Sequence, residues 1–300
     1  MLTTRFGIEI EMTGLTRSKA AKVVQTVTGG RVEHTGTCYD TWTVIATDNR
    51  KWKLMSDASL KTQKKVEGYV TGASQLYSVE LVSPILTYEA DIKILQEIVR
   101  ALRKNGAFAN DSCGIHIHLD GKGHSVRSIK NFIHIIYARN DLFYSALQIK
   151  NARRGYCRQL DEWLVRDIKA KQPNTLKDIE DIWYSHSSQN RTQHYNNTRY
   201  HFLNLHSFFH GHKTVELRGF NSTLHAGEIR SYIVFALALN HQALTQKSAT
   251  TKKPQVENPK FAMRTYLNRI GLIGDEFKAC REHLTKHLEG SAAWRHNEAI

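Results

Sequence analysis

The sequence predicts an α+β fold in which strands come first, helices are inserted between them, and strands return before a helical end. Two observations carry this prediction. Apolar and polar residues alternate along several short segments, as they do on a half-buried strand, and apolar residues recur every three to four positions in the segments between them. The 300 residues are 41% hydrophobic, which allows a sizeable core in one large domain or two small ones.

The first half of the chain alternates strands with short helices. Period-two alternation or β-rich runs predict strands over 5–12, 41–46, 51–55, 76–82 and 114–119. A short helix is expected over 18–27, before Gly29 and Gly30. Thr87 is expected to cap an amphipathic helix that ends at Asn105-Gly106.

The second half is richer in helices. A long helix is predicted over 125–148, and the charged stretch 150–190 is mostly helical, with a second start at Thr175. Strand patterning returns over 198–221, and an apolar helix follows over 228–244. We therefore predict a catalytic domain over 1–245 with a helical insertion at about 125–195, then a linker and helical tail over 246–300.

Charge and cysteine usage limit the class of protein. Lys and Arg number 42 against 28 Asp and Glu, so the formal net charge is +14, which suits either a nucleic acid or an anionic substrate. No apolar run approaches the roughly 20 residues of a membrane span, and the first residues lack the apolar segment of a secretory signal. Four cysteines without a Cys-x-x-Cys pair indicate reduced thiols and a cytoplasmic location.

Carboxylates and histidines, which can bind metals, and one arginine fall on the strand positions opposite the apolar ones. They are Glu9, Glu11, Glu80, His116, His118, Glu216 and Arg218, with Asp57 directly after another strand. Hard divalent cations prefer carboxylate oxygens, and Mg²⁺ usually keeps waters and substrate phosphates as well. A sheet face with this composition would hold Mg²⁺ against a nucleotide, and the ions would relieve the repulsion between the carboxylates.

Each of these signals also has a plain structural explanation. A single Glu-x-Glu is usually a solvated strand face, His-x-His is often structural, and Glu-x-Arg is often an ion pair. Their recurrence on four strands favours a site. The histidines His201, His206, His210 and His212 would suit Zn²⁺ or Ni²⁺, but a solvent-facing strand and turn is the favoured interpretation. No P-loop, dinucleotide-binding turn, His-Glu-x-x-His or Gly-x-Ser-x-Gly motif is present.

The order of these motifs resembles the putative amidoligase family, carboxylate–amine ligases related to glutamate–cysteine ligase and glutamine synthetase. The similarity covers roughly 5–245. It runs through FGIEIEM (6–12), WKLMSDASL (52–60), VELVSP (79–84), CGIHIHL (113–119), RYHFLNLHS (199–207) and TVELRGFNST (214–223). The resemblance implies a curved, mostly antiparallel sheet of the glutamine synthetase catalytic-domain type, with helices packed outside.

The resemblance also implies a reaction and residue roles. ATP would phosphorylate a carboxylate, and an amine would attack the acyl phosphate to give an amide, with Mg²⁺ or Mn²⁺ as the metal. The implied metal ligands are Glu9, Glu11, Glu80, His116 and Glu216. His116 and His118 would contact the nucleotide, Arg218 would stabilise phosphate charge, and Arg199 would contact a carboxylate or phosphate. Asp57 is a substrate-side residue and a candidate base, because amine attack needs a proton acceptor.

Two other functions compete with the ligase. Basic stretches at 61–65 and 151–158, together with the metal-binding residue types, would also suit a metal-dependent nucleic-acid-binding or nuclease-like protein. A catalytically inactive relative is the third hypothesis. The ligase hypothesis expects small-molecule or peptide substrates and no membrane partner, whereas the sequence names neither the carboxylate nor the amine.

Overall fold

A large antiparallel sheet organises the molecule in the computed structural model, which describes residues 1–294. Within these residues eight strands pair in the order β2-β3-β4-β7-β1-β8-β10-β9. Their bounds are β1 (Phe6–Met12), β2 (Arg31–His34), β3 (Trp42–Ile45), β4 (Lys51–Met55), β7 (Val79–Val82), β8 (Gly114–Asp120), β9 (Leu203–Asn204) and β10 (Thr214–Asn221). The predicted α+β class is confirmed, and the sheet stays open, with β2 and β9 at its edges.

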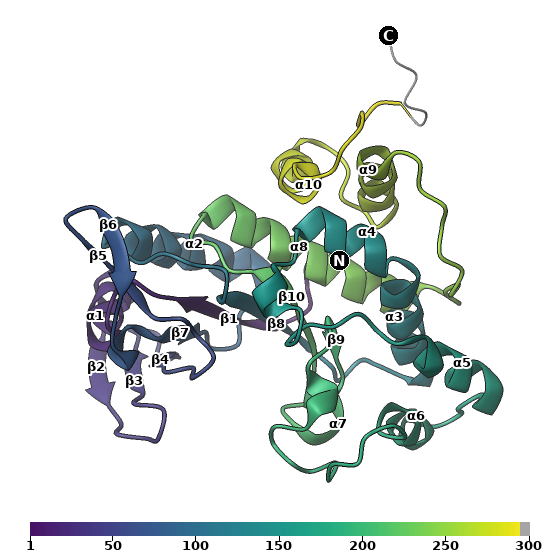
Figure 1. Cartoon of the computed structure of the whole chain (residues 1–300), viewed down its shortest axis with the longest axis horizontal. Coiled ribbons are helices and arrows are strands. Elements are labelled where there is room, and N and C mark those ends of the chain that lie inside the picture. The colour runs from purple at the N-terminus through teal and green to yellow at the C-terminus, as the bar shows by residue number, and fades with distance from the viewer. Residues whose placement is uncertain (295–300) are drawn as a thin grey trace.

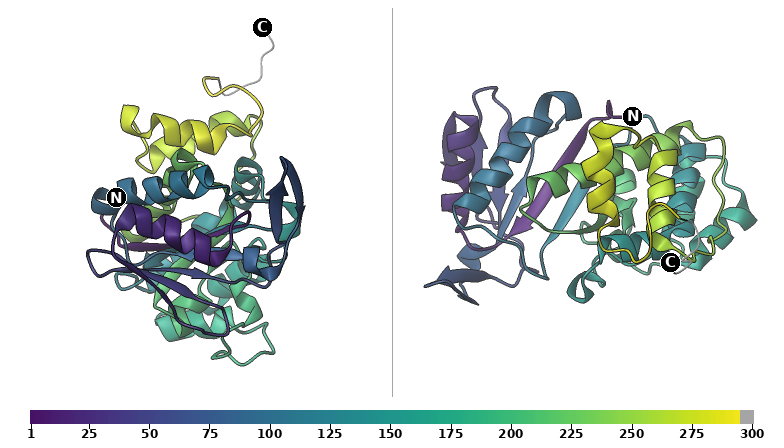
Figure 2. Two further views of the ribbon diagram at one scale, coloured as in Figure 1. Left: turned by 90° about the vertical axis from the view of Figure 1, so that its left-hand side faces the viewer. Right: turned by 90° about the horizontal axis from the view of Figure 1, so that it is seen from above.

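Helices cover one face of this sheet (Figure 1). On that face lie α1 (Arg17–Thr28), α2 (Tyr88–Lys104), α3 (Val126–Ala138) and α8 (Ala226–Thr245). Beyond the β9 edge lie α5 (Glu162–Lys171), α6 (Leu176–Trp183) and α7 (His206–His210). The helices α9 (Pro259–Arg269) and α10 (Lys278–Thr285) form an outer layer, in which α10 packs on α8 (Figure 2).

The core lies between the sheet and the helices. Along β1 and β8, every second residue points into it, and Ile8, Ile10, Ile115 and Ile117 are at most 1% exposed. Alternation along a strand places the intervening residues on the other face, which no helix of this layer covers. The apolar residues of the period-two pattern therefore lie in the core, and the polar residues lie together on the opposite face of the sheet.

The prediction of one helix over 125–148 is wrong, because the structure has two. The helix α3 ends at Ala138, and α4 (Asn140–Leu147) follows after Arg139. At Arg139 the backbone has φ −121° and ψ 12°, and its N–H donates to Ile136 O rather than continuing the α-helical ladder. Asn140 Nδ2 donates to Leu160 O at 3.3 Å, so a contact distant in sequence fixes the break.

The expected strand over 198–221 is interrupted. It contains β9, the short helix α7 and β10, because Asn204 Oδ1 accepts from His206 N at 2.8 Å and turns the chain into α7. The strand predicted over 76–82 begins later, at Val79, after a 3₁₀ turn over Gln75–Tyr77.

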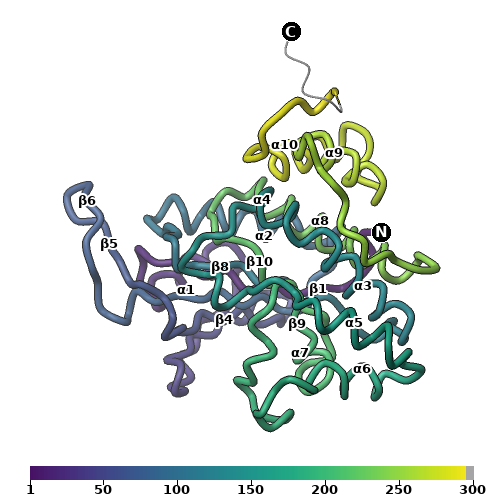
Figure 3. The backbone as a smooth tube through the Cα atoms, turned by 45° about the vertical axis from the view of Figure 1, so that its right-hand side comes forward, coloured from purple at the N-terminus to yellow at the C-terminus, as the bar shows by residue number. Residues whose placement is uncertain are grey.

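Sequence analysis missed a separate two-stranded hairpin, β5 (Gln63–Val66) and β6 (Tyr69–Gly72). Its turn uses Glu67 and Gly68, both with positive φ, which matches the twist of a tight hairpin. The hairpin projects from the rest of the molecule (Figure 3), and its residues from Glu67 to Gly72 are exposed. Because both faces meet water, the hydrophobic alternation that identifies a half-buried strand is weak here.

The chain after α8 has no helix or strand until α9 begins at Pro259. The domain boundary predicted there stays a prediction, and residues 295–300 of the expected tail lie outside the described part of the chain. None of the helices in residues 1–294 combines the length and apolar character needed to cross a membrane.

Candidate active site

Four neighbouring strands bring the predicted polar residues together on the face of the sheet opposite α1, α2, α3 and α8. In register, Glu11 of β1 lies opposite Glu80 of β7, and Glu9 lies opposite His116 of β8. On the next strand, β10, Glu216 lies opposite His118. We call the set Glu9, Glu11, Glu80, His116, His118, Glu216 and Arg218 the carboxylate face.

Two histidines hold Glu9 between them. His116 Nδ1 lies 2.9 Å from Glu9 Oε2, and His118 Nε2 lies 3.1 Å from Glu9 Oε1. The Glu9 side chain is 24% exposed, whereas that of His116 is only 6% exposed, so solvent reaches the cluster at Glu9. Burial and the charge of Arg218 lower the pKa of His116 to about 4, so His116 contacts Glu9 as a neutral ring at pH 7, and the charged partner of Glu9 is His118.

Glu216 is the most enclosed carboxylate of the face, at 2% exposure. Arg218 Nη1 donates to Glu216 Oε1, and Asn204 Nδ2 donates to Glu216 Oε2 at 2.6 Å. Arg218 itself is 5% exposed, and its Nε donates to Tyr156 O at 3.4 Å. Both carboxylate oxygens of Glu216 therefore have partners, and the two hydrogen bonds of Arg218 fix the orientation of its guanidinium group.

Glu11 and Glu80 form the other end of the face, next to Asp57. Gly114 N donates to Glu11 Oε2 at 2.5 Å, which fixes the carboxylate against β8. Asp57 Oδ1 accepts from both the backbone N–H and the hydroxyl of Ser59, at 2.7 and 2.6 Å. Asp57 thus sits on a hydrogen-bonded turn beside the buried Glu11 and the half-buried Glu80.

The donor atoms of the face are spaced as metal ligands require. Three overlapping groups each have one donor atom per residue, all within 4.8 Å of one another. The groups are Glu9 with His118 and Glu216, Glu9 with Glu80 and His116, and Glu11 with Asp57 and Glu80. His118 Nε2 is buried and lies 3.1 Å from Glu9 Oε1 without a well-aligned hydrogen bond, and the ring would have to lose a proton before this nitrogen could coordinate an ion. The oxygen-rich donor set suits Mg²⁺ or Mn²⁺.

Cations keep one half of the face ionised. Burial raises the pKa of Glu216, but Arg218 and His118 outweigh burial and hold it at about 2. Burial also raises the pKa of Glu9, but the neighbouring histidines, mainly His118, lower it well below its usual range. Burial opposes protonation of His118, yet Glu216 and Glu9 raise its pKa to about 9.

The other half lacks such cations. Burial raises the pKa of Glu80 well above its ordinary value, and Glu9 and Glu11 raise it further. Burial and the charge of Asp57 raise the pKa of Glu11 to about 7. A divalent ion at this end would replace the missing positive charge.

Arg199 lies apart from the carboxylate face. Its guanidinium lies 5.3 Å from the centre of the Tyr195 ring, and its Nη1 donates to His194 O at 3.3 Å. Within residues 1–294 it makes no ion pair, and its Nε is buried without a hydrogen bond. Tyr195 reaches across to Tyr39, with the hydroxyls 2.5 Å apart. The predicted substrate role of Arg199 stays a prediction.

The structure adds two residues that sequence analysis missed. Asn204 binds Glu216, and its position on a strand two residues before His206 is the only signal in the sequence. Arg153 is 2% exposed and donates to Phe220 O and Arg218 O, at 2.7 and 2.8 Å. Nothing in the sequence distinguishes it from its neighbour Arg154, which is exposed.

Three of the four histidines over 201–212 have partners outside the carboxylate face. His206 Nδ1 lies 2.6 Å from the Tyr184 hydroxyl, and His210 Nε2 lies 2.9 Å from Glu180 Oε1. His201 Nδ1 bonds to Thr198 O at 2.9 Å. The His206 and His210 contacts join the segment between β9 and β10 to α6 and its C-terminal end.

Comparison with known proteins identifies the family of the chain. No curated protein matches the chain at a significant level. A family model described as "Putative amidoligase enzyme" matches residues 2–240, which include every residue of the carboxylate face. The chain therefore belongs to the putative amidoligase family.

Proposed function

We propose that the protein is an ATP- and Mg²⁺-dependent ligase that joins a carboxylate to an amine through an acyl phosphate. Family membership indicates an amide-forming ligase-type enzyme. The observation that carries the finer proposal is the set of three overlapping donor groups on one sheet face, with Arg218 fixed beside them. Phosphoryl transfer needs cations on the phosphate oxygens and a fixed line of attack, and such a face supports both.

The two ends of the face would serve different purposes. Glu9, His118 and Glu216 would hold one ion, and Glu11 and Glu80 would hold a second, next to Asp57. Bound Mg²⁺ and ATP would supply the charge neutralisation and the phosphoryl group that make a carboxylate reactive. Arg218 is buried, keeps its charge, and can present the part of its fork not used by Glu216 to an anionic group.

Asp57 is the proposed acceptor of the amine proton. One of its oxygens is occupied by Ser59, and its carboxylate belongs to the same group of donor atoms as Glu11 and Glu80. A protonated amine is attracted to such an acidic end before it loses its proton. The carboxylate and amine would be small molecules or peptide ends.

The decisive experiment measures ADP release over pairs of carboxylates and amines with ATP and Mg²⁺. We expect Glu216→Gln to lower turnover by about two orders of magnitude or more, because Arg218 and a proposed metal lose the same charge. Glu97→Gln, the same change on an exposed position of α2, should leave turnover unchanged. Circular dichroism should show that both variants are folded.

Three other outcomes would contradict the proposal or favour an alternative function. Full activity in Glu216→Gln would contradict the proposed metal set. Cleavage of DNA or RNA without ATP would favour the nuclease-like alternative, whose binding should weaken steeply with salt. Mg²⁺ binding without ADP release from any pair would favour an inactive relative.

A further inference from the structure

The hairpin formed by β5 and β6 is rich in exposed apolar side chains. We call residues 61–76, which contain it, the hairpin segment. Ten large hydrophobic residues of the described chain are exposed, and four of them lie in this segment: Val66, Tyr69, Val70 and Leu76. Tyr69 is the most exposed of the ten, at 77%. Single exposed apolar residues are common on any protein, but a group of them on one projecting element indicates an interaction surface.

The outer edge of β6 has no partner strand. On the other strand, Gln63 O accepts from Gly14 N at 3.0 Å and Gln63 N donates to Thr13 Oγ1 at 2.8 Å, so the backbone groups of Gln63 point away from β6. Alternation along the antiparallel pair then points the N–H and C=O groups of Val70 and Gly72 away from β5. Within residues 1–294, no other segment forms a hydrogen bond with these groups. An open edge of this kind accepts an extended chain as a further strand.

Positive charge accompanies the apolar residues on both faces of the hairpin. Side chains alternate along each strand, and directly paired residues share a face. Lys64 therefore lies on the same face as Tyr69, and Lys65 lies on the other face with Val70. Glu67 is the one carboxylate of the hairpin segment, and within residues 1–294 none of the lysines of this segment forms an ion pair. A ligand that lies along the hairpin would therefore need both apolar groups and negative charge.

The base of the hairpin is fixed beside one end of the carboxylate face. The partners of Gln63, Thr13 and Gly14, follow Glu11 of that face by two and three residues. Asp57, at the same end of the face, precedes Gln63 by six residues. These six residues and the four of β6 together span roughly 33 Å when extended. A peptide of about ten residues is therefore long enough to lie on β6 and reach the carboxylate face.

We propose that the outer edge of β6 binds an extended acidic peptide, which adds to the hairpin as a third strand. The peptide backbone would pair with Val70 and Gly72, its apolar side chains would pack beside Tyr69 or Val70, and its carboxylates would be attracted to Lys64 or Lys65. Neither a nucleic acid nor a membrane surface pairs with a row of backbone N–H and C=O groups as a peptide does.

A second copy of the chain fits this edge less well than an acidic peptide. Pairing of two hairpins would bring their unpaired lysines toward one another, and such charges repel. A bound peptide that carries the reacting carboxylate would be the substrate of the proposed ligase. That assignment of substrate class rests on the proposed function, whereas the docking itself needs neither ATP nor Mg²⁺.

Fluorescence anisotropy without ATP or Mg²⁺ tests the docking, with a labelled decapeptide of alternating Glu and Val as the probe. We expect this probe to bind, and a decapeptide of alternating Lys and Val not to bind. N-methyl groups on two adjacent central residues of the Glu-Val probe remove backbone donors and block the approach of the strands. That modified probe should bind at least about tenfold more weakly, because backbone pairing supplies much of the affinity in strand addition.

Two substitutions in the hairpin test the side chains. Lys64→Glu should weaken binding of the Glu-Val probe about fivefold or more, because it replaces attraction by repulsion. Tyr69→Ser should weaken binding about threefold or more, because it removes apolar contact area. Both residues are accessible to solvent and belong to no core cluster, so circular dichroism and melting temperature should match the wild type.

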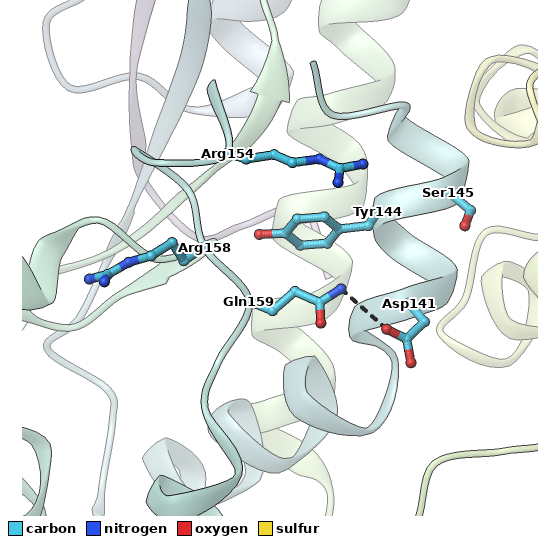
Figure 4. Close-up of a pocket in the computed structure, with 6 residues that line it drawn as sticks. All are labelled: Asp141, Tyr144, Ser145, Arg154, Arg158 and Gln159. Carbon is cyan, nitrogen blue, oxygen red and sulfur yellow. Dashed lines mark hydrogen bonds between the residues drawn. The ribbon is translucent and has the colours of Figure 1, made fainter. Parts of the chain in front are cut away.

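The matched control reverses a charge beside a tyrosine that is not on a strand edge. Arg154 is exposed, lies outside the strands and extends along the Tyr144 ring (Figure 4). Arg154→Glu should bind the Glu-Val probe as the wild type does. Glu216→Gln should also bind it normally, which separates the docking from the proposed reaction.

Several results would overturn the docking proposal. They are equal weakening in Lys64→Glu and Arg154→Glu, undiminished binding of the N-methylated probe, or no binding of the Glu-Val probe at millimolar concentration. A dimer that Tyr69→Ser abolishes would assign the edge to a second copy of the chain instead. ADP release from small-molecule pairs by a protein that does not bind the probe would overturn the docking and leave the proposed function standing.

Discussion

At the residue scale, identical side chains on the carboxylate face behave in opposite ways. Glu216 and Glu80 are both glutamates on neighbouring parts of one sheet surface. Arg218 and His118 hold the pKa of Glu216 at about 2, whereas burial and nearby carboxylates raise that of Glu80 well above its usual value. The same residue type therefore has different charge states on this face, because burial and the neighbouring charged groups set each pKa.

Glu80→Gln should reveal this difference as a pH-dependent change in stability. In the unfolded chain Glu80 loses its proton near pH 4.5, but in the folded chain it keeps the proton to a higher pH. Glu80 should therefore add to the loss of stability of the wild type as pH rises from about 4.5 through its folded pKa, and the variant should lack this contribution while both proteins keep that of Glu11. In chelator, the melting temperature of Glu80→Gln relative to wild type should rise with pH.

Under the proposed function Mg²⁺ should reduce that difference, because wild type would bind the ion through Glu80 and the variant would bind it less well. The exposed change Glu97→Gln should show no such pH trend. A melting-temperature difference between Glu80→Gln and wild type that stays constant from pH 4 to pH 8 would contradict the raised pKa.

At the element scale, β10 departs from a regular strand at the point where the site needs it. Its register against β8 shifts between Leu217 and Phe220. A Cβ at Gly219 would lie 2.0 Å from the Phe202 ring, so only glycine fits there. Arg153 binds the carbonyls on both sides of this glycine. The shift aims Arg218 along the carboxylate face while Phe220 returns to the core.

Arg153→Ala should destabilise the fold by about 2–5 kcal/mol, because two buried carbonyls lose their donors. Arg154→Ala, the same change one residue later and on an exposed side chain, should change stability by less than about 0.5 kcal/mol. Urea unfolding curves measure both. Similar losses in the two variants would mean that the buried guanidinium does not support the strand.

At the scale of the whole molecule, α8 is a central helix covered on both sides. Its side facing the sheet meets the core, and its outer side meets α10 (Figure 2). Glu228 of α8 pairs with Lys286 at 2.5 Å, and Leu284 of α10 is fully buried. The C-terminal helices therefore complete the hydrophobic core, although the family model ends at residue 240.

Leu284→Ala should cost about 2–5 kcal/mol of unfolding free energy, since it leaves a cavity between α10 and α8. Leu76→Ala removes the same atoms from a residue that is 55% exposed, and should cost under about 0.5 kcal/mol. Thermal or urea unfolding distinguishes the two. An equally small effect of Leu284→Ala would show that the tail contributes little to the core.

The sequence by itself determined which residues share a face, because strand alternation is local and has a period of two. It placed Glu9 with Glu11, His116 with His118, and Glu216 with Arg218, and the structure keeps each pair on one side of its strand. The sequence also predicted α1, α2 and α8 to within about two residues at each end. The apolar spacing and the residues that begin and end each helix are local features of the sequence.

Only the tertiary structure decided how these pairs meet. The strand order places β7, β1, β8 and β10 side by side, although they lie up to about two hundred residues apart in the chain. The break at Arg139, the burial of Arg153 beside the exposed Arg154, and the opposite pKa shifts of Glu80 and Glu216 all depend on such distant contacts. Local sequence patterns do not encode these features, because the burial and the charge of a side chain depend on the distant segments that pack against it.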